Sequence, residues 1–296
     1  MKLATFNIYW LGKKEKIVRA DADRALIAQV LSGMDADVIA FQEIVDPAEL
    51  QKIIDLTNNL KPNRSYRTYD KNNQLLGTGE NWDQKVVVAF DERQYELVAA
   101  SPILGGAKRL PFGLRVRSLV DGGQALVIGV HFKSGQPAFE DAASAEVRRL
   151  QCQHLADWIA GAHEAVNSVL PRPVHNEHVV ILGDFNALYE LEPHQPEEWR
   201  IVVESLAPLR QAHMKDWWWE KPEADPAGGG RVTAYTEDLL IDFVMLSPSL
   251  KNRIAYSPTI YAYDKDPEII GSPAKDVRYR VSDHRPVCVA VDVSPV

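Results

Sequence analysis

Two short apolar runs constrain the fold of this chain more than any other sequence feature. Residues 86–90 read Val-Val-Val-Ala-Phe and residues 179–182 read Val-Val-Ile-Leu, so neither run alternates between apolar and polar side chains. Strands with one face in water alternate, whereas strands that are covered on both faces are continuously apolar. The two runs therefore predict strands buried between other layers of an α/β protein.

Further short strands and longer helices alternate along the chain. Helical periodicity covers residues 19–31, 47–60 and 143–165, and the second helix has Asp46 as N-cap and Pro47 in its first turn. Apolar or alternating runs predict strands at residues 3–8, 37–41, 85–90, 125–131, 178–182, 241–246 and 286–293.

A Gly-rich turn indicates that the sheets are mixed. Residues 113–120 and 124–130 flank Asp121-Gly122-Gly123, which predicts an antiparallel hairpin next to the helix-linked strands. Purely parallel, doubly wound sheets are therefore not expected. Residues 69–83 and 220–231 are predicted surface loops.

Composition excludes several classes of protein. With 46% hydrophobic and 25% charged residues, the 296-residue chain has an ordinary globular composition, neither disordered nor collagen-like. The net charge of −8 argues against a protein that coats nucleic acid through bulk charge, but allows an enzyme that handles phosphates at a local metal site. Two cysteines cannot form a disulfide framework, and neither a signal-peptide segment nor a membrane-spanning run is present. We expect a cytoplasmic protein without a membrane span.

Polar residues cluster just beyond the ends of the apolar strands. A single polar residue there is usually a turn former or a helix cap. Several groups that recur at strand ends are instead typical of α/β enzyme sites. In chain order, the groups are Asn7, Gln42-Glu43, His131-Phe132-Lys133-Ser134, Asp184-Phe185-Asn186, Asp242 and Ser282-Asp283-His284.

Four of these motifs resemble those of the endonuclease/exonuclease/phosphatase superfamily, which includes the DNase I-like nucleases. They are Thr5-Phe6-Asn7, Phe41-Gln42-Glu43, Gly183-Asp184-Phe185-Asn186 and Ser282-Asp283-His284. The resemblance extends from Thr5 to Pro286 and implies a single domain over residues 1–296. The implied fold is a four-layered α/β sandwich, with two packed mixed β-sheets flanked by helices.

The resemblance also implies a metal site. Glu43 matches the metal-binding glutamate of the family, Asn7 lies beside it, and Asp283 is a further candidate ligand. Such oxygen ligands suit Mg²⁺ or Mn²⁺, which keep some of their waters and bridge to substrate phosphate.

The catalytic residues follow from the same resemblance. His284 matches the C-terminal histidine of the family, either as a general base or as a cation held against phosphate, and Asp242 matches the aspartate that orients it. Asp184 is expected to position or deprotonate the attacking water, and Asn186 to donate a hydrogen bond to phosphate. His131 matches the second histidine of the DNase I-like branch, which contacts the phosphate or assists the leaving oxygen.

Other residues have two interpretations each. Arg109 resembles a phosphate-contacting arginine of the family, or else lies in a solvated turn. Arg115 and Arg117 are expected to form a surface pair, and Lys133 either reaches the phosphate or points away from it. The run Trp217-Trp218-Trp219 either forms an apolar wall over the substrate or packs a corner between sheet and loop, and at least one indole is expected to be exposed.

The predicted function is hydrolysis of a phosphodiester with a divalent metal, with endonuclease action on DNA as the leading hypothesis. The first alternative keeps the chemistry but changes the substrate to a phospholipid headgroup or another small phosphoester. The second is a catalytically silent binding module, which the intact motif set argues against. We expect a monomer without an obligate protein partner.

Overall fold

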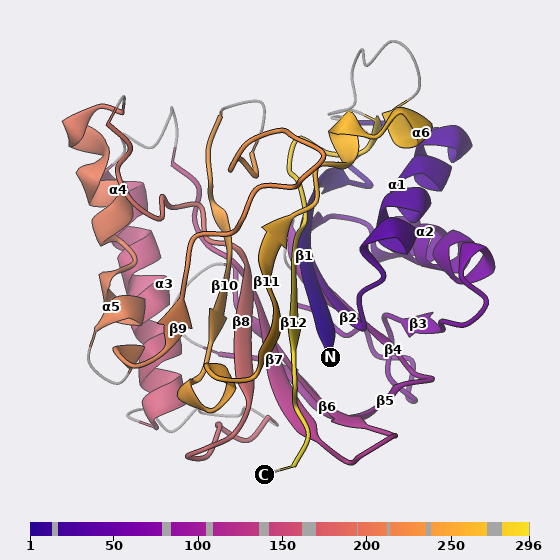
Figure 1. Ribbon diagram of the computed structural model, residues 1–296, viewed down its shortest axis with the longest axis horizontal. Coiled ribbons are helices and arrows are strands. Elements are labelled where there is room, and N and C mark those ends of the chain that lie inside the picture. The colour runs from indigo at the N-terminus through magenta and orange to yellow at the C-terminus, as the bar shows by residue number, and fades with distance from the viewer. Residues whose placement is uncertain are drawn as a thin grey trace.

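The chain folds into two six-stranded β-sheets that pack face to face (Figure 1). The computed structural model describes residues 1–13, 17–78, 84–104, 109–135, 142–161, 170–193, 195–211, 214–234, 238–270 and 280–295. In order, the strands of the first sheet are β11 (Ile254–Ile260), β12 (Val287–Val291), β1 (Lys2–Leu11), β2 (Val38–Ile44), β4 (Lys85–Asp91) and β3 (Tyr66–Arg67). Only β1 and β2 pair in parallel, so this sheet is mixed.

The second sheet is mixed in the same way. The predicted hairpin is confirmed, since its two strands, β6 and β7, pair antiparallel, whereas β7 and β8 pair in parallel. In order, its strands are β5 (Tyr95–Pro102), β6 (Phe112–Ser118), β7 (Gln124–His131), β8 (Val179–Asp184), β10 (Asp242–Leu246) and β9 (Trp218–Trp219).

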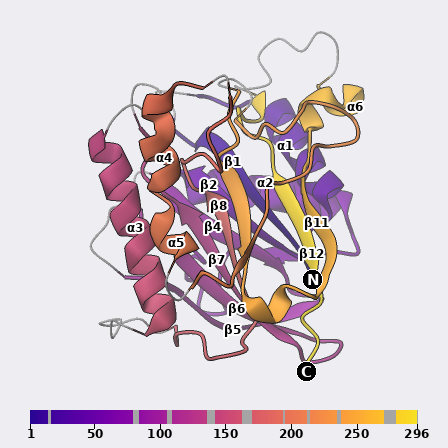
Figure 2. The same ribbon diagram turned by 60° about the vertical axis from the view of Figure 1, so that its left-hand side comes forward.

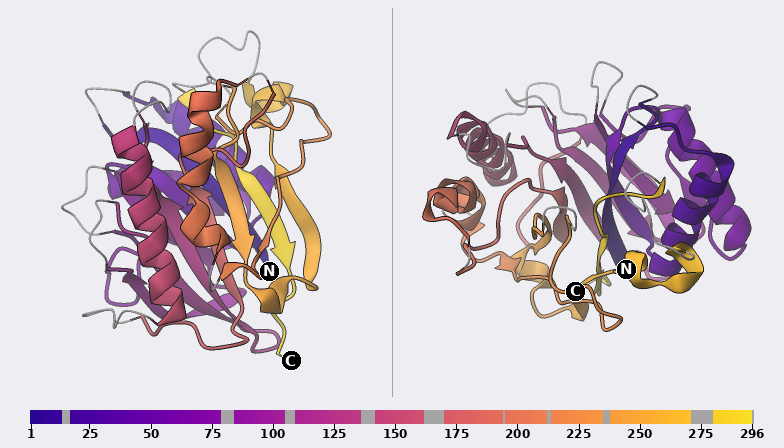
Figure 3. Two further views of the ribbon diagram at one scale, coloured as in Figure 1. Left: turned by 90° about the vertical axis from the view of Figure 1, so that its left-hand side faces the viewer. Right: turned by 90° about the horizontal axis from the view of Figure 1, so that it is seen from above.

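Helices cover both outer faces of the sheet pair. The view from above in Figure 3 shows α1 (Asp21–Met34) and α2 (Pro47–Leu60) outside the first sheet. The turned view in Figure 2 brings α3 (Ala142–Ala160), α4 (Arg200–Glu204) and α5 (Ala207–Arg210) in front of the second sheet. The fold is thus the predicted four-layered sandwich. The short helices are α6 (Pro267–Ile270), η1 (Glu197–Trp199), η3 (Pro248–Leu250) and η4 (Tyr263–Lys265).

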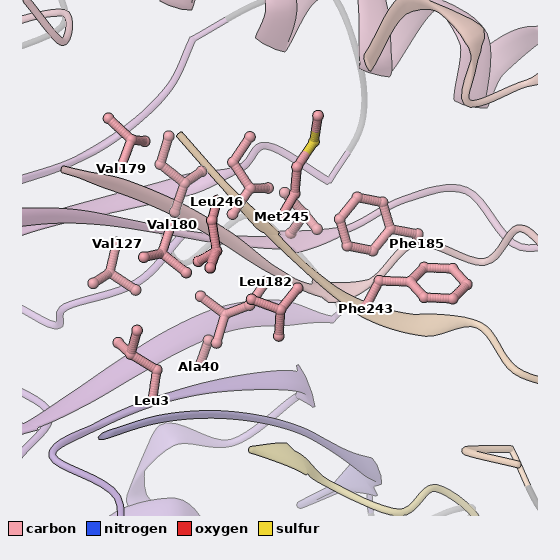
Figure 4. Packing of buried hydrophobic residues seen from close by; sticks show 14 of the residues in the cluster. Leu3, Ala40, Val127, Val179, Val180, Leu182, Phe185, Phe243, Met245 and Leu246 are labelled. Atoms are coloured by element: carbon pink, nitrogen blue, oxygen red, sulfur yellow. The ribbon is translucent and has the colours of Figure 1, made fainter. Parts of the chain in front are cut away.

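Side chains that alternate along each strand build two cores. On β1, Leu3 faces the second sheet, whereas Phe6 faces α1 and α2. Figure 4 shows Leu3 and Ala40 of the first sheet lying opposite Val127 and Leu182 of the second. Every residue of β4 and β8 is buried, which confirms the reading of their apolar runs.

The ends of several predicted elements differ from the structure, by one to three residues in most cases. The first helix begins at Asp21 rather than at residue 19, because Ala20 is extended and Arg19 makes tertiary contacts instead. The third helix is described as far as Ala160, and the predicted residues 162–165 lie outside the described part. The last strand ends at Val291 rather than at residue 293.

Cys152 and Cys288 are both free thiols. Within the described residues, no helix has the length and apolarity needed to cross a bilayer.

Candidate active site

The polar residues predicted at strand ends meet at one edge of the sheet pair. Those on β1, β7, β8 and β10 occupy the next inward-facing position beyond the apolar core. Asn7 follows Thr5 on β1, and Asp184 follows Leu182 on β8. Register places His131 beside Asp184 on one side and Asp242 beside it on the other. The side-chain period of two residues therefore turns these groups toward the space between the sheets.

Glu43 reaches this cluster through a local irregularity of β2. Strict alternation would turn its side chain toward the helices, since Phe41 lies in the core on that side. Instead, Glu43 has a left-handed φ of 60° at a register shift between β2 and β4. Its carboxylate then accepts hydrogen bonds from the Trp10 backbone N–H (3.0 Å) and the Asn7 amide (3.3 Å). Burial and the nearby charge of Asp283 raise the pKa of Glu43, against the opposing effect of His284.

Asp242 and His284 form a buried ion pair. The Asp242 Oδ2 lies 2.8 Å from the His284 Nδ1. Burial alone would lower the pKa of His284, but the charge and hydrogen bond of Asp242, with Asp184 and Asp283 nearby, raise it well above the ordinary value. His284 is therefore a cation at neutral pH.

The turn that carries His284 is held at several points. The Ser282 hydroxyl donates to the Asn7 carbonyl (2.6 Å), which ties the turn to β1. The Tyr263 hydroxyl contacts the carbonyls of both Ser282 (2.8 Å) and His284 (3.1 Å). On the opposite side, the Thr233 Oγ1 accepts the Asp242 backbone N–H (3.1 Å). These contacts fix both members of the ion pair.

Asp184 stands at the centre of the cluster. One of its carboxylate oxygens accepts the Asn7 amide (3.0 Å), and the other accepts the Asn186 backbone N–H (2.8 Å). Burial and the like charge of Asp242 raise the pKa of Asp184 above that of an ordinary carboxyl. A carboxylate with a raised pKa suits proton transfer near neutral pH. The side chain of Asn186 donates to the Phe132 carbonyl (3.1 Å).

Arg109 is part of the site rather than a solvated turn. Its Nη1 contacts the His131 Nε2 and the Phe132 carbonyl, both at 2.9 Å, and its Nη2 donates to the Gln84 Oε1 at 2.6 Å. A guanidinium can only donate, so the His131 Nε2 accepts and carries no proton in this arrangement. Burial and the charges of Arg109 and His284 lower the pKa of His131 well below its ordinary value, so this histidine is neutral.

Oxygen donors for a divalent ion are present beside Glu43. The Asn7 Oδ1 is buried and accepts no hydrogen bond from the residues that the structure describes, and Asp283 lies close enough to affect the pKa of Glu43. A carboxylate pair with an amide oxygen fits Mg²⁺ or Mn²⁺. A second group of candidate ligands, with donor atoms within 4.8 Å of one another, consists of Asp184, Asp242 and His284. A protonated His284 cannot coordinate an ion, so the donor set with Glu43 fits better.

Several other sequence candidates have partners outside this cluster. Arg115 pairs with Glu177 (2.9 Å) and Arg117 with Glu96 (3.2 Å), so each has its own acid partner. Lys133 donates from its ammonium to the Ser134 carbonyl. All three tryptophans at positions 217–219 are half-buried, so the expectation that at least one is exposed was wrong.

The tryptophan run packs a corner of the second sheet. The Trp219 ring contacts Phe185 and Phe243, with centroids 5.4 and 5.6 Å away. Trp218 and Trp219 pair with β10 as the short strand β9. The packing interpretation therefore accounts for this motif.

Two contributors were missed by sequence reasoning. Gln84 supports Arg109, and Arg19 contacts the segment that leads into the His284 turn. Neither lies in a recognisable motif. Each acts through a contact between residues far apart in the chain, which no local pattern reveals.

Comparison with known proteins agrees with this geometry. Residues 4–284 match the model of the Endonuclease/Exonuclease/phosphatase family. No curated protein matches the sequence significantly.

Solved structures share the fold at low identity. The endonuclease/exonuclease/phosphatase from Bacteroides vulgatus is 14% identical, with a TM-score of 0.62 and coverage of 99% of this chain and 98% of that one. The human Nocturnin catalytic domain with bound sulfate is 14% identical, with a TM-score of 0.60 and coverage of 98% and 93%. A Bacteroides thetaiotaomicron mannosyl-6-phosphatase is also 14% identical, with a TM-score of 0.58 and coverage of 99% of each chain.

Proposed function

This chain belongs to the endonuclease/exonuclease/phosphatase family, whose members hydrolyse phosphoester bonds, and on that premise we propose that it is a divalent-metal-dependent phosphodiesterase. DNA is the first substrate that we propose for it, cleaved by in-line attack of an activated water. The observation that carries the proposal is the convergence of Asn7, Glu43, Asp184, Asp242 and His284 at one edge of the sheet pair.

The residues divide into a metal side and a proton-transfer side. Glu43 and Asn7, with Asp283, would hold the ion. When bound, a divalent ion offsets the negative charge that builds up on phosphate oxygens in the transition state. Asp184 is hydrogen-bonded on both oxygens and has a raised pKa, which suits a group that orients the attacking water and accepts its proton.

His284 and Arg109 supply positive charge for the substrate phosphate. The ion pair with Asp242 uses the His284 Nδ1, so the proton on its other ring nitrogen is available for a phosphate oxygen. Because Arg109 donates to the His131 Nε2, we propose that His131 positions Arg109 rather than giving a proton to the leaving oxygen. The contact with phosphate then belongs to the guanidinium, with Asn186 as a further amide donor.

Hydrolysis of a defined set of substrates tests this function. Purified protein is incubated with supercoiled plasmid, bis-p-nitrophenyl phosphate and a set of sugar and lipid phosphoesters, with Mg²⁺ or Mn²⁺. Nicking of the plasmid that EDTA and the His284→Ala substitution both abolish is the expected result. Cleavage of the small diester without any cleavage of DNA would contradict DNA as the substrate but not the chemistry.

A small phosphoester is the second candidate substrate. The net charge of −8 disfavours tight binding to a polyanion. One structural neighbour is a mannosyl-6-phosphatase. Turnover of a sugar or lipid phosphoester above that of plasmid DNA would favour this candidate. Failure to hydrolyse any phosphoester, with no metal bound by calorimetry, would instead support a silent binding module.

A further inference from the structure

A buried arginine just before α1 connects two parts of the site. Arg19 is only 5% exposed, although it lies in an extended segment outside the helix. Its Nη2 donates to the Tyr9 carbonyl at 3.0 Å and to the Val281 carbonyl at 2.9 Å. One nitrogen therefore joins strand β1 to the segment that leads into the His284 turn.

The two carbonyls belong to segments with different tasks. Tyr9 lies two residues after Asn7 and precedes Trp10, whose backbone N–H holds the Glu43 carboxylate. Val281 precedes Ser282, Asp283 and His284. Arg19 thus joins the segment that orients the proposed metal ligand to the segment that carries the proposed catalytic cation. A displacement of about 1 Å between two such groups is enough to slow a reaction strongly.

The charge of Arg19 lies close to the acids of the site. Burial lowers the pKa of Arg19 to about 10, while Tyr263, Asp23, Asp283 and Glu43 oppose that effect. The side chain therefore remains a cation at neutral pH. A cation here reduces the repulsion between the Glu43 and Asp283 carboxylates.

The remaining donors of Arg19 have no acceptor in the part of the chain that the structure describes. Both of them, the Nε and the Nη1, are buried. Buried donors without acceptors destabilise a folded protein. A guanidinium that served stability alone would be expected to satisfy these atoms. Its placement is better explained by the carbonyls it joins and by the acids it faces.

We propose that Arg19 is a positioning residue of the site, which holds the turn at residues 281–284 against β1 and thereby keeps His284 in register with Glu43. The inference rests on the proposed hydrolase function. Arg19 acts through the turn and through Trp10, and it is not assigned a contact with substrate.

Three variants test this role. Arg19→Met removes the charge and both carbonyl contacts but keeps an unbranched side chain, and Arg19→Lys keeps the charge and a donor. Arg64→Met is the matched control, because Arg64 also joins chain segments, through Asp91 (3.0 Å) and Asp35 (3.2 Å), at the opposite end of the first sheet. If Arg19→Met does not fold, Arg19→Gln replaces it with the same expectation.

The measurements are kcat and KM on the best substrate, and hydrogen exchange of residues 280–286 by mass spectrometry. We expect Arg19→Met to lower kcat at least ~10-fold with KM changed less than ~3-fold, and to speed exchange of this segment. Arg19→Lys should recover most of kcat, and Arg64→Met should keep the kcat and exchange of the wild type.

Three results would overturn the inference. The first is wild-type kcat and exchange in Arg19→Met. The second is an equal loss of kcat in Arg64→Met, and the third is a Lys variant no better than the Met variant. If the wild-type protein hydrolyses no phosphoester, the proposed function fails separately. Hydrogen exchange then still decides whether Arg19 holds the turn.

Discussion

The two histidines of the site, both buried, have opposite charge states. Burial alone lowers the pKa of each, yet His131 lies against the Arg109 cation and His284 against the Asp242 carboxylate. The first is therefore neutral and the second charged at neutral pH. Their neighbours, rather than their exposure, give them different roles in the proposed reaction.

Replacing Asp242 by Asn is expected to change the pH dependence of the reaction. Asp242 raises the pKa of His284, so His284 stays charged as the pH rises. Activity that needs the charged form should decline only when the pH passes this raised pKa. Without the carboxylate, a charged hydrogen bond of about 1.5–3 kcal/mol is lost, and the alkaline limb should move down by about 1–2 pH units. The pH profile of kcat/KM measures this shift.

The exposed carboxylate of Asp292 provides the control for that profile. Asp292→Asn should leave the alkaline limb where the wild type has it. If His284 were instead a general base, it would have to be neutral. Asp242→Asn lowers the pKa of His284, so activity would in that case extend toward lower pH. That result would contradict the assignment of His284 as a cation.

Glu43→Gln is expected to weaken metal binding while leaving the protein folded. The substitution removes a negative oxygen ligand but keeps the size of the side chain and an acceptor for the Trp10 N–H. The affinity for Mn²⁺, measured by calorimetry without substrate, should fall at least ~10-fold, which corresponds to about 1.4 kcal/mol. Glu49→Gln, in α2, is the control. Equal affinities in all three proteins would place the ion elsewhere, with the group of Asp184, Asp242 and His284 as the next candidate.

At the level of elements, the two sheets approach closely beneath His131. A Cβ at Gly129 of β7 would lie 2.9 Å from the Val86 Cγ1 and 3.3 Å from the Ala40 Cβ. Gly129→Ala should therefore lower the free energy of unfolding by about 1–3 kcal/mol through overpacking. Val86→Ala opens space at this contact. The double variant Gly129→Ala/Val86→Ala should therefore be more stable than the sum of the two single losses in unfolding free energy predicts. If the two losses in unfolding free energy, measured by urea denaturation, simply add in the double variant, the contact between the sheets is not tight.

Much of the element order was predictable from sequence, although strands β5 and β11 and helices α4 and α5 were not expected. The positions of key side chains were not predictable. Apolar runs and helical periodicity identified β4, β8 and α2, because burial acts on residues that are neighbours in the chain. Glu43 was identified by motif, yet its left-handed backbone and its turn toward Asn7 depend on pairing with β4. The roles of Arg19 and Gln84 depend on partners many residues away, and the helical pattern even placed Arg19 in α1.

At the scale of the whole molecule, the candidate site uses both sheets. Asn7 and Glu43 come from the first sheet, whereas His131, Asp184 and Asp242 come from the second. We propose that residues 1–296 form one domain and unfold as one unit. In urea, tryptophan fluorescence, which reports on all seven tryptophans of the chain, and far-ultraviolet circular dichroism should give the same midpoint. Separate midpoints would contradict a single unit.

The overall charge makes a prediction about how DNA would be held. The protein has a net charge of −8, and in the described part of the site Arg109 and His284 are the cations proposed to face the substrate phosphate. Each neutralised phosphate contributes about −0.9 to the slope of the logarithm of the binding constant against the logarithm of the salt concentration. Two phosphates therefore predict a slope of about −1.8. Binding of a DNA duplex to the wild-type protein in the presence of Ca²⁺, measured by fluorescence anisotropy between low and moderate salt, gives this slope. A slope near −6 or steeper would reveal an extended basic surface and would make DNA the better substrate, whereas a shallow slope favours a small phosphoester or brief contact with DNA.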